Sequence, residues 1–129
     1  QLHSKIINDK RVEYYENINA KYNFTLNSNK VDIIVVDVSF ISVKKIILQL
    51  INFLSKNSYL VVLIKPQFEA KKNEVEIGGV IKNVLLIPKI LDDVIKNIQK
   101  NNLNLRDLKK SELKGRKGNQ EFFAIFKLS

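Results

Sequence analysis

The apolar residues of this chain gather in short runs that predict buried strands. Within residues 32–40 the run is unbroken from Ile33 to Val36 and rich in β-branched side chains, which is typical of a parallel strand buried on both faces. A second run, residues 59–64, ends at Lys65-Pro66, because proline supplies no donor for a strand ladder. Weaker patterns predict further strands at residues 11–16, 103–108 and 121–128.

Helical spacing appears between these runs. Ser42 is a residue type that caps helices, and one buried face is predicted after it from the apolar positions Val43, Ile46, Ile47, Leu50, Ile51 and Leu54. A second helix is predicted from about Val84 or Pro88 to Lys100, with a stripe at Ile87, Leu91, Val94, Ile95 and Ile98. A short helical piece is expected at residues 4–9, and polar loops at residues 22–30 and 66–82.

The predicted order is strand, strand, helix, strand, helix, strand, strand. This alternation predicts an α/β fold whose parallel sheet is wound in the right-handed sense. Only the basic loop of residues 109–119 separates the last two strands, which is too short for a helical crossover. We therefore expect one domain with a mostly parallel sheet and an antiparallel C-terminal hairpin at one edge.

Composition and charge narrow the class of protein. The 129 residues include no cysteine, which excludes disulfides and thiolate metal sites and suits a cytoplasmic protein. The longest apolar run is far shorter than the roughly 20 residues of a membrane span. The formal net charge is +9, from 22 Lys and Arg against 13 Asp and Glu. Such an excess suits a nucleic-acid partner, but the Lys- and Asn-rich composition of an AT-rich genome would produce it too.

Charged residues directly follow both predicted buried strands. Asp37 comes after the first run and Lys65 after the second, and the carboxyl ends of neighbouring parallel strands meet at one rim of a sheet, where ligands bind. Glu121 begins the last strand, which runs the opposite way, so it should reach the same rim. A lysine between two carboxylates is either an ordinary ion pair or a positioned base or hydrogen-bond donor, and the residues alone leave both open.

Other candidates carry weaker signals. The basic loop 109–119 either tracks nucleic-acid phosphates or is simply solvated. Phe40 and Phe68 each follow a rim charge by three residues, and either stack on a base or belong to the core. Gly78-Gly79 lacks the spacing of a phosphate-binding loop and predicts a hinge or turn. His3, the only histidine, is not favoured as a ligand or base.

Six strings, taken together, carry a family resemblance. They are QLHSKI (1–6), ENINAKY (16–22), DVSFIS (37–42), KPQFE (65–69), GGV (78–80) and KGxxGNQEFF (114–123). In this order they resemble the hemolysin-A (TlyA) family of FtsJ-like RNA 2′-O-ribose methyltransferases, over essentially the whole chain. DVSF together with KPQFE after a buried strand is the specific pair. The resemblance implies a Rossmann-like class I methyltransferase sheet that uses S-adenosylmethionine (SAM).

The resemblance also implies a catalytic set similar to Lys–Asp–Lys–Glu. Asp37, Lys65 and Glu121 match its last three members. Lys65 would deprotonate or orient a ribose 2′-hydroxyl for attack on the SAM methyl group, and Asp37 and Glu121 would orient the lysine and the substrate.

Candidate cofactor contacts follow from the same resemblance. They are expected from Asn19, Asp37 and Val38, although a loop-capping role suits Asn19 at least as well. Because the loop 109–119 is basic, contacts to RNA phosphates are expected from its residues Lys114, Arg116 and Lys117, and no metal ligands are expected.

Some family features have no counterpart in these residues. The first catalytic lysine, the glycine-rich cofactor loop and the small amino-terminal RNA-binding domain are missing, Asn17-Ile18 replaces Arg-Thr, and Lys21 replaces Arg. The chain also has no methionine. We therefore expect residues 1–129 to be the C-terminal part of a methyltransferase domain that lacks its N-terminal strands. Alone it should be inactive, and its open sheet edge would favour a homodimer.

The predicted function is SAM-dependent 2′-O-ribose methylation of ribosomal RNA, free or in ribosomal subunits, by a cytoplasmic protein. A non-catalytic RNA-binding module of the same fold is one alternative, and it would not need Asp37, Lys65 and Glu121. A membrane-active hemolysin, suggested by the family's name, is another. The sequence argues against it, because it has no strongly basic amphipathic helix with an aromatic face.

Overall fold

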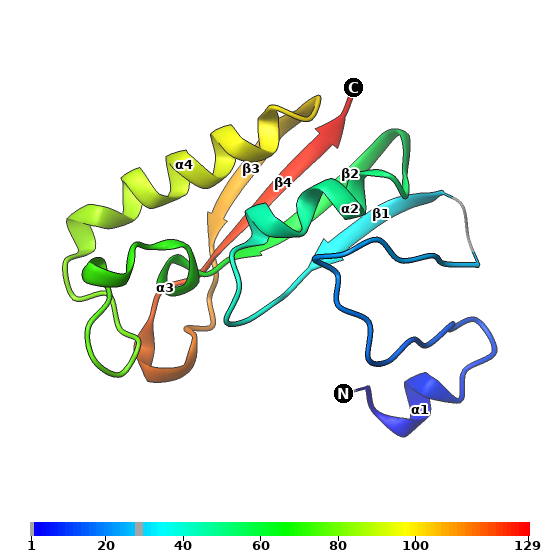
Figure 1. Cartoon of the computed structure of the whole chain (residues 1–129), viewed down its shortest axis with the longest axis horizontal. Coiled ribbons are helices and arrows are strands. Elements are labelled where there is room, and N and C mark those ends of the chain that lie inside the picture. Colours follow the sequence, from blue (N-terminus) through cyan, green and yellow to red (C-terminus); the bar gives the residue numbers. More distant parts are fainter. Residues whose placement is uncertain (1, 28–29) are drawn as a thin grey trace.

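The computed structural model describes residues 2–27 and 30–129, and its strands form one four-stranded sheet. The strand order is β1-β2-β4-β3, with bounds β1 Val31–Val36, β2 Leu54–Ile64, β3 Leu103–Lys110 and β4 Phe122–Leu128. β1 and β2 are parallel, whereas β4 is antiparallel to both of its neighbours (Figure 1). The predicted α/β class with a mixed sheet is therefore confirmed.

The hairpin predicted from the last two strands is confirmed, and its placement explains the mixed sheet. β4 inserts between β2 and β3, so that β3 forms the outer edge. Ile64 at the end of β2 pairs with Phe122 at the start of β4. The carboxyl end of β2 and the amino end of β4 therefore lie side by side.

Helices cover one face of the sheet. α2 (Ile47–Ile51) and α4 (Ile87–Gln99) lie along the same side of the strands (Figure 1). Alternate positions of the central strands point to this face and are completely buried: Leu60, Val62, Ile64, Ala124 and Phe126. Burying a valine, leucine, isoleucine or phenylalanine side chain contributes roughly 1.5–3 kcal/mol, so the larger side chains of this layer make a major contribution to folding.

The opposite face of the sheet carries no helix from the described residues. Ile33 and Val35 of the edge strand β1 are 59% and 74% exposed, and Tyr59 and Phe123 are also exposed there. The unbroken apolar run of β1 was predicted to be buried on both faces, and in these residues it is buried on one. Its other face is available to whatever packs against it.

The helix predicted after Ser42 is present but divided and shorter. The Ser42 hydroxyl accepts a hydrogen bond from the backbone N–H of Lys44 and caps a 3-10 turn, η1 (Val43–Lys45), before α2 begins. The assignment of Leu54 to this helix was wrong, because Leu54 starts β2 and pairs with Val31. A buried leucine is compatible with a helix or with a strand, so its spacing did not distinguish the two.

The strand predicted at residues 11–16 was wrong. That segment has no ladder partner among the described residues, and its polar groups bond locally instead. The Tyr15 hydroxyl donates to Glu13 at 3.0 Å, and that of Tyr14 donates to Glu16. An alternating pattern cannot make a strand without a neighbour to receive its backbone hydrogen bonds. The short helix before it, α1 (Ser4–Ile7), was predicted correctly, and the His3 ring caps it.

The remaining connections hold short helical turns. α3 (Pro66–Glu69) follows β2, and three 3-10 turns are η2 (Lys72–Glu74), η3 (Val84–Leu86) and η4 (Arg116–Gly118). The predicted helix near Val84–Lys100 is confirmed as η3 and α4, and the predicted turn at Gly78-Gly79 has left-handed backbone angles at both glycines. In the part of the chain that the structure describes, no helix has the length and apolar character needed to cross a membrane.

Candidate active site

Three strand ends bring the predicted charged residues to one rim. Asp37 follows β1, Lys65 follows β2, and Glu121 precedes β4. Because β4 runs against β2 with Ile64 opposite Phe122, the residues just outside this pair, Lys65 and Glu121, share the rim. The sheet therefore gathers the three residues as expected from strand direction alone.

Lys65 is held by two oxygen atoms from the loop after β1. Its Nζ lies 2.7 Å from Asp37 Oδ1 and donates to Ser39 Oγ at 3.0 Å. The Lys65 side chain is only 13% exposed, whereas that of Asp37 is 69% exposed. A lysine ammonium has three N–H donors, so one is left to meet a ligand. The arrangement makes Lys65 an oriented hydrogen-bond donor.

Glu121 has a different partner from the one that its charge suggests. Only 8% exposed, it accepts a hydrogen bond at Oε2 from Gln67 Nε2 at 3.0 Å. Among the ion pairs formed by the described residues, none joins Glu121 to Lys65. The expected lysine between two carboxylates is thus resolved into a Lys65–Asp37 pair and a separate Gln67–Glu121 pair.

Lys65 of the first pair and both members of the second border one cavity of about 500 Å³, which we call the rim cavity. From the sheet side it is lined by Ser39, Phe40, Lys65, Gln67, Phe68 and Glu121. From the loop side it is lined by Gly78, Gly79, Gly115, Arg116, Lys117 and Asn119. A donor, a carboxylate, aromatic rings and two cationic side chains thus face one space, which suits a nucleotide.

The loop wall of the rim cavity is held together by Asn119. Its side chain donates to the Gly79 carbonyl at 2.8 Å and accepts from the backbone N–H of Ile81 at 3.2 Å, and it is 7% exposed. Lys117 Nζ donates to the Gly78 carbonyl. The predicted RNA-binding residues Arg116 and Lys117 therefore border the rim cavity, whereas Lys114 lies exposed in the same loop without being part of its lining.

Phe40 stands in an unusual backbone conformation at the mouth of the rim cavity. Its φ is +64°, a region that bulky residues rarely adopt, and it is 89% exposed. Its ring lies 5.0 Å from that of Phe68, centroid to centroid, at a tilt of 54°. Such strained positions concentrate at functional sites. Core packing, one of the two roles considered for this phenylalanine, does not fit its exposure.

The predicted cofactor residues adjoin a second, shallow cavity of about 610 Å³. Asn19 and Val38 line it together with Ile18, Ala20, Ile41 and Ile46, and Asp37 is not among the lining residues. The Asn19 side chain accepts from the backbone N–H of Lys21 at 3.0 Å, which is the loop-capping role that the sequence also allowed. Apolar walls with an amide nearby have the chemistry that a purine ring needs.

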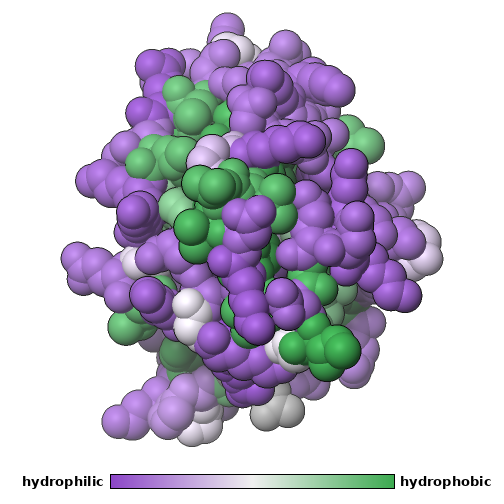
Figure 2. Space-filling view, turned by 90° about the vertical axis from the view of Figure 1, so that its left-hand side faces the viewer, coloured by the Kyte–Doolittle hydropathy of each residue, from purple (hydrophilic) through white to green (hydrophobic). Residues whose placement is uncertain are grey.

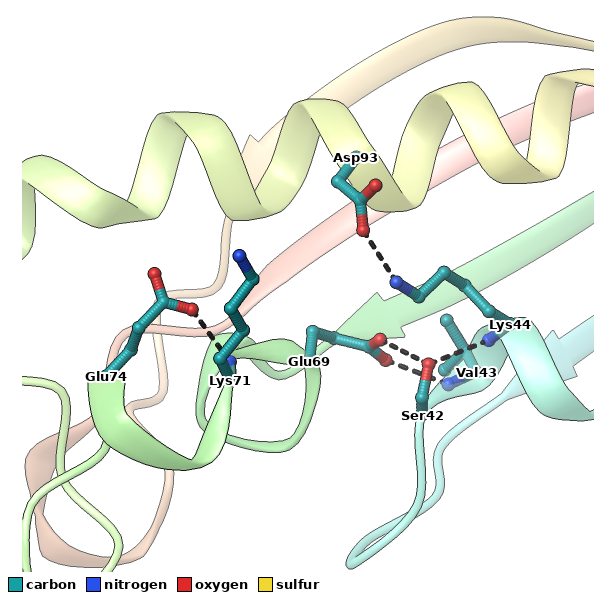
Figure 3. Close-up of polar contacts among 7 residues, drawn as sticks. All are labelled: Ser42, Val43, Lys44, Glu69, Lys71, Glu74 and Asp93. Atoms are coloured by element: carbon teal, nitrogen blue, oxygen red, sulfur yellow. Dashed lines mark hydrogen bonds and ion pairs between the residues drawn. The ribbon is translucent and has the colours of Figure 1, made fainter.

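The Glu69 carboxylate, which lies behind the rim, connects the loop after β1 to α3. Glu69 of α3 accepts from the Ser42 hydroxyl at 2.6 Å and from the Val43 backbone N–H at 2.8 Å, and Lys44 beside them pairs with Asp93 of α4 at 2.6 Å (Figure 3). Burial raises the pKa of the Glu69 carboxyl, against the opposing effect of these hydrogen bonds. This network fixes the loop that carries Asp37 and Ser39 to the helix that carries Gln67.

Two of the loops that border the rim cavity, the one after α3 and the one between β3 and β4, lie at the left of Figure 1, and Figure 2 shows that side of the molecule. Hydrophilic side chains dominate it, with apolar groups in separate patches (Figure 2). Exposed apolar residues in the neighbouring loops are Ile77, Leu85 and Leu113.

Sequence reasoning missed four residues of the site: Ser39, Gln67, Gly115 and Asn119. Each lies within a string that carried the resemblance, so its position was noticed but its role was not. Gly115 matters because an added Cβ would lie 2.6 Å from Glu121 Oε2. A signal for Gln67 was available, because it stands two residues after the rim lysine at the start of a helix that Pro66 begins.

Comparison with known proteins assigns a family to these features. The family model described as FtsJ-like methyltransferase matches residues 1–128. Hemolysin A of Brachyspira hyodysenteriae is 40% identical over 128 residues, which are 98% of this chain and 53% of that protein. The 16S/23S rRNA (cytidine-2′-O)-methyltransferase TlyA of Mycobacterium tuberculosis is 34% identical over 125 residues, 95% of this chain and 46% of that protein.

A solved structure agrees. A Streptococcus thermophilus protein whose name contains the word hemolysin superimposes with a TM-score of 0.94 at 29% identity, covering 100% of this chain and 47% of that one. The chain therefore spans about half the length of the relatives it matches. The resemblance predicted from the six strings is confirmed.

Proposed function

Because the chain belongs to the FtsJ-like methyltransferase family, we propose that the protein containing it methylates a ribose 2′-hydroxyl of ribosomal RNA with SAM as methyl donor. In this proposal residues 1–129 are the C-terminal part of the methyltransferase domain, and the reaction takes place in the cytoplasm, on ribosomal RNA or on ribosomal subunits. The names of two TlyA relatives, which specify ribosomal RNA cytidine 2′-O-methylation, support the substrate.

The observation that carries the proposal is the restrained lysine beside a buried carboxylate. Lys65 is positioned by Asp37 at 2.7 Å and by Ser39 at 3.0 Å, and Glu121 borders the same cavity. In methyl transfer to a hydroxyl, the hydroxyl must be aimed at the methyl carbon and must lose its proton. Lys65 donates to the ribose oxygen and aims it, and Glu121 accepts from the hydroxyl.

The second cavity fits part of the cofactor. Val38, Ile41 and Ile46 offer apolar surface to a purine, with Asn19 at the edge. When bound, SAM would supply the methyl group for the ribose oxygen. Asp37 directly precedes Val38, which lines the second cavity, and pairs with Lys65, which lines the rim cavity.

RNA contacts come from the basic loop and from Phe40. Arg116 and Lys117 line the rim cavity, Lys114 lies in the same loop, and the +9 charge favours a polyanion. Phe40, exposed at the mouth, offers a stacking surface for a base.

The experiment uses the complete protein that contains this chain, labelled SAM and ribosomal subunits. Lys65→Met should lower methyl transfer by about 10²–10³-fold, the range for loss of one positioned hydrogen-bond donor. Lys56→Ala is the matched control, because Lys56 is an exposed lysine near the start of β2, at the other end of the strand. The proposal fails if folded wild-type protein labels no ribosomal RNA, or if label appears on a base and not on ribose.

A further inference from the structure

Glu121 has the surroundings of a carboxylate whose orientation matters. It is 8% exposed, it borders the rim cavity, and the structure describes no hydrogen bond to its Oε1. Its backbone is fixed, since its carbonyl accepts from the Ser111 N–H at 2.9 Å. This backbone contact does not set the direction of the side-chain carboxylate, which depends on contacts of its own.

Two residues confine this carboxylate. Gln67 Nε2 donates to Glu121 Oε2 at 3.0 Å. Gly115 also lies close to the same oxygen, because an added Cβ there would come within 2.6 Å of Oε2, 2.9 Å of Cδ and 3.4 Å of Gln67 Nε2, so this position leaves the carboxylate no room for a side chain. Gln67 is the only side chain that the described residues offer as a hydrogen-bond donor to it.

The second amide atom of Gln67 is also informative. Its Oε1 is buried and has no hydrogen-bond partner among the described residues. A buried acceptor without a partner is unfavourable, and in native structures such groups call for an explanation. Turning the amide would point Oε1 at the Glu121 carboxylate, which is itself an acceptor, so the bond to Glu121 would be lost and Oε1 would gain no donor there. The orientation present keeps the N–H on the carboxylate.

We propose that Gln67 is a positioning residue of the methyl-transfer site, which holds the Glu121 carboxylate so that its free Oε1 accepts from the nucleotide hydroxyl. The inference rests on the proposed function. An amide N–H donates to an accepting oxygen, so Gln67 fixes the direction in which the Glu121 carboxylate points. In this role Gln67 acts through Glu121.

Variants of Gln67 in the complete protein test this role by their pH dependence. In Gln67→Glu, the new side chain can replace the amide donor only while the carboxyl groups at positions 67 and 121 share one proton. When both are ionised, the two carboxylates repel each other. The ratio of its kcat to that of wild type should therefore fall as the pH rises over about 5 to 8. Gln67→Met has no donor at any pH, so its kcat should be reduced about 10- to 100-fold throughout, with KM little changed.

The matched control is Gln120→Glu. Gln120 precedes Glu121, and its Nε2 donates to the backbone carbonyls of Ser111 and Glu121, both at 2.9 Å, without touching the Glu121 carboxylate. Its loss should lower the thermal midpoint and leave the pH profile unchanged. The other charged residues lining the rim cavity, Lys65, Arg116 and Lys117, are the same in all of these variants.

A second measurement tests the contact without activity. In ¹H–¹⁵N spectra, the side-chain amide protons of Gln67 should exchange slowly in wild type and lose this protection in Glu121→Ala. The inference is overturned if protection is unchanged in Glu121→Ala, or if folded Gln67→Glu and Gln67→Met keep wild-type kcat and pH profile. If instead the wild type itself transfers no methyl group although the contact is present, the proposed function fails, and the role of Gln67 in transfer fails with it.

Discussion

The confinement of Glu121 leads to a prediction about Gly115→Ala. Gly115 has φ −64° and ψ 172°, which any residue adopts, so alanine causes no backbone strain there. The conflict is with the carboxylate, because the new Cβ would lie 2.6 Å from Glu121 Oε2, whereas ordinary van der Waals contact begins at 3.4 Å. The carboxylate must therefore move by about 0.8 Å.

A displacement of this size is large on the scale of catalysis. A misplacement of about 1 Å in a reacting geometry can cost about 10²-fold in rate. We therefore expect Gly115→Ala to lower kcat by up to about 10²-fold, which is about 2.7 kcal/mol of transition-state stabilisation. The free energy of unfolding should change little, because the atom that yields is the end of a side chain.

Gly118→Ala is the natural comparison. Gly118 stands in the same loop at φ +83°, and an added Cβ would meet no atom within 4 Å. Here alanine strains the backbone by roughly 1–2 kcal/mol but leaves Glu121 in place. It should therefore lower the thermal midpoint and retain kcat, the reverse of Gly115→Ala.

The assay is methyl transfer to ribosomal subunits under saturating and limiting RNA, beside thermal denaturation of each variant. The reasoning is refuted if Gly115→Ala transfers at the wild-type rate while Glu121→Gln does not, since the carboxylate would then tolerate the displacement. It is also refuted if both alanine variants change only stability.

Three further outcomes follow from the packing and electrostatics. Asn119→Ala should lower the free energy of unfolding, measured in urea, by about 1–3 kcal/mol, because it leaves the backbone N–H of Ile81 without its acceptor. Ile81 is only 7% exposed, so water does not replace that acceptor freely. Asn104→Ala, on the exposed edge of the sheet, should not lower the free energy of unfolding in this way. Burial raises the pKa of Glu69, so its contribution to stability is full below its ordinary value of 4.5 and is lost as the pH rises through the raised value. In urea titrations across this range, Glu69→Gln should gain on wild type as the pH rises, and a constant difference would contradict the assignment. Finally, the 129-residue chain alone should associate with increasing concentration in sedimentation experiments, and Ile33→Lys on the open β1 edge should reduce this; a monomeric wild-type chain would exclude the edge as an interface.

The rim residues could be predicted because they depend on strand direction alone. Asp37 and Lys65 each follow an unbroken apolar run, and such runs fix where parallel strands end. Glu121 lies on the same rim because the short loop between the last two strands requires the last strand to run back along the one before it. These local signals therefore predicted that the three residues share one rim, although Asp37 and Glu121 are 84 positions apart in sequence.

The partner of Glu121 could not be predicted in the same way. Gln67 lies 54 residues from Glu121, and their contact depends on how α3 leaves β2 and how the loop after β3 folds back. Neither path has a periodic signal in the sequence. The incorrect prediction of a strand at residues 11–16 has the opposite cause. The local pattern favoured a strand, but the described residues include no neighbouring strand that pairs with it.

The contacts at the rim assign different tasks to its two carboxylates. A lysine that is only 13% exposed needs a counter-charge, and Asp37 at 2.7 Å supplies it, so Asp37 acts by keeping the Lys65 ammonium in place. A lysine held in this way is positioned to donate a hydrogen bond to a ligand. In the proposed reaction a ribose hydroxyl must also lose its proton, and of the residues that line the rim cavity Glu121 is the one carboxylate. We infer that the lysine aims the hydroxyl and that Glu121, held by Gln67, receives from it, which is why the orientation of a buried carboxylate should govern the rate.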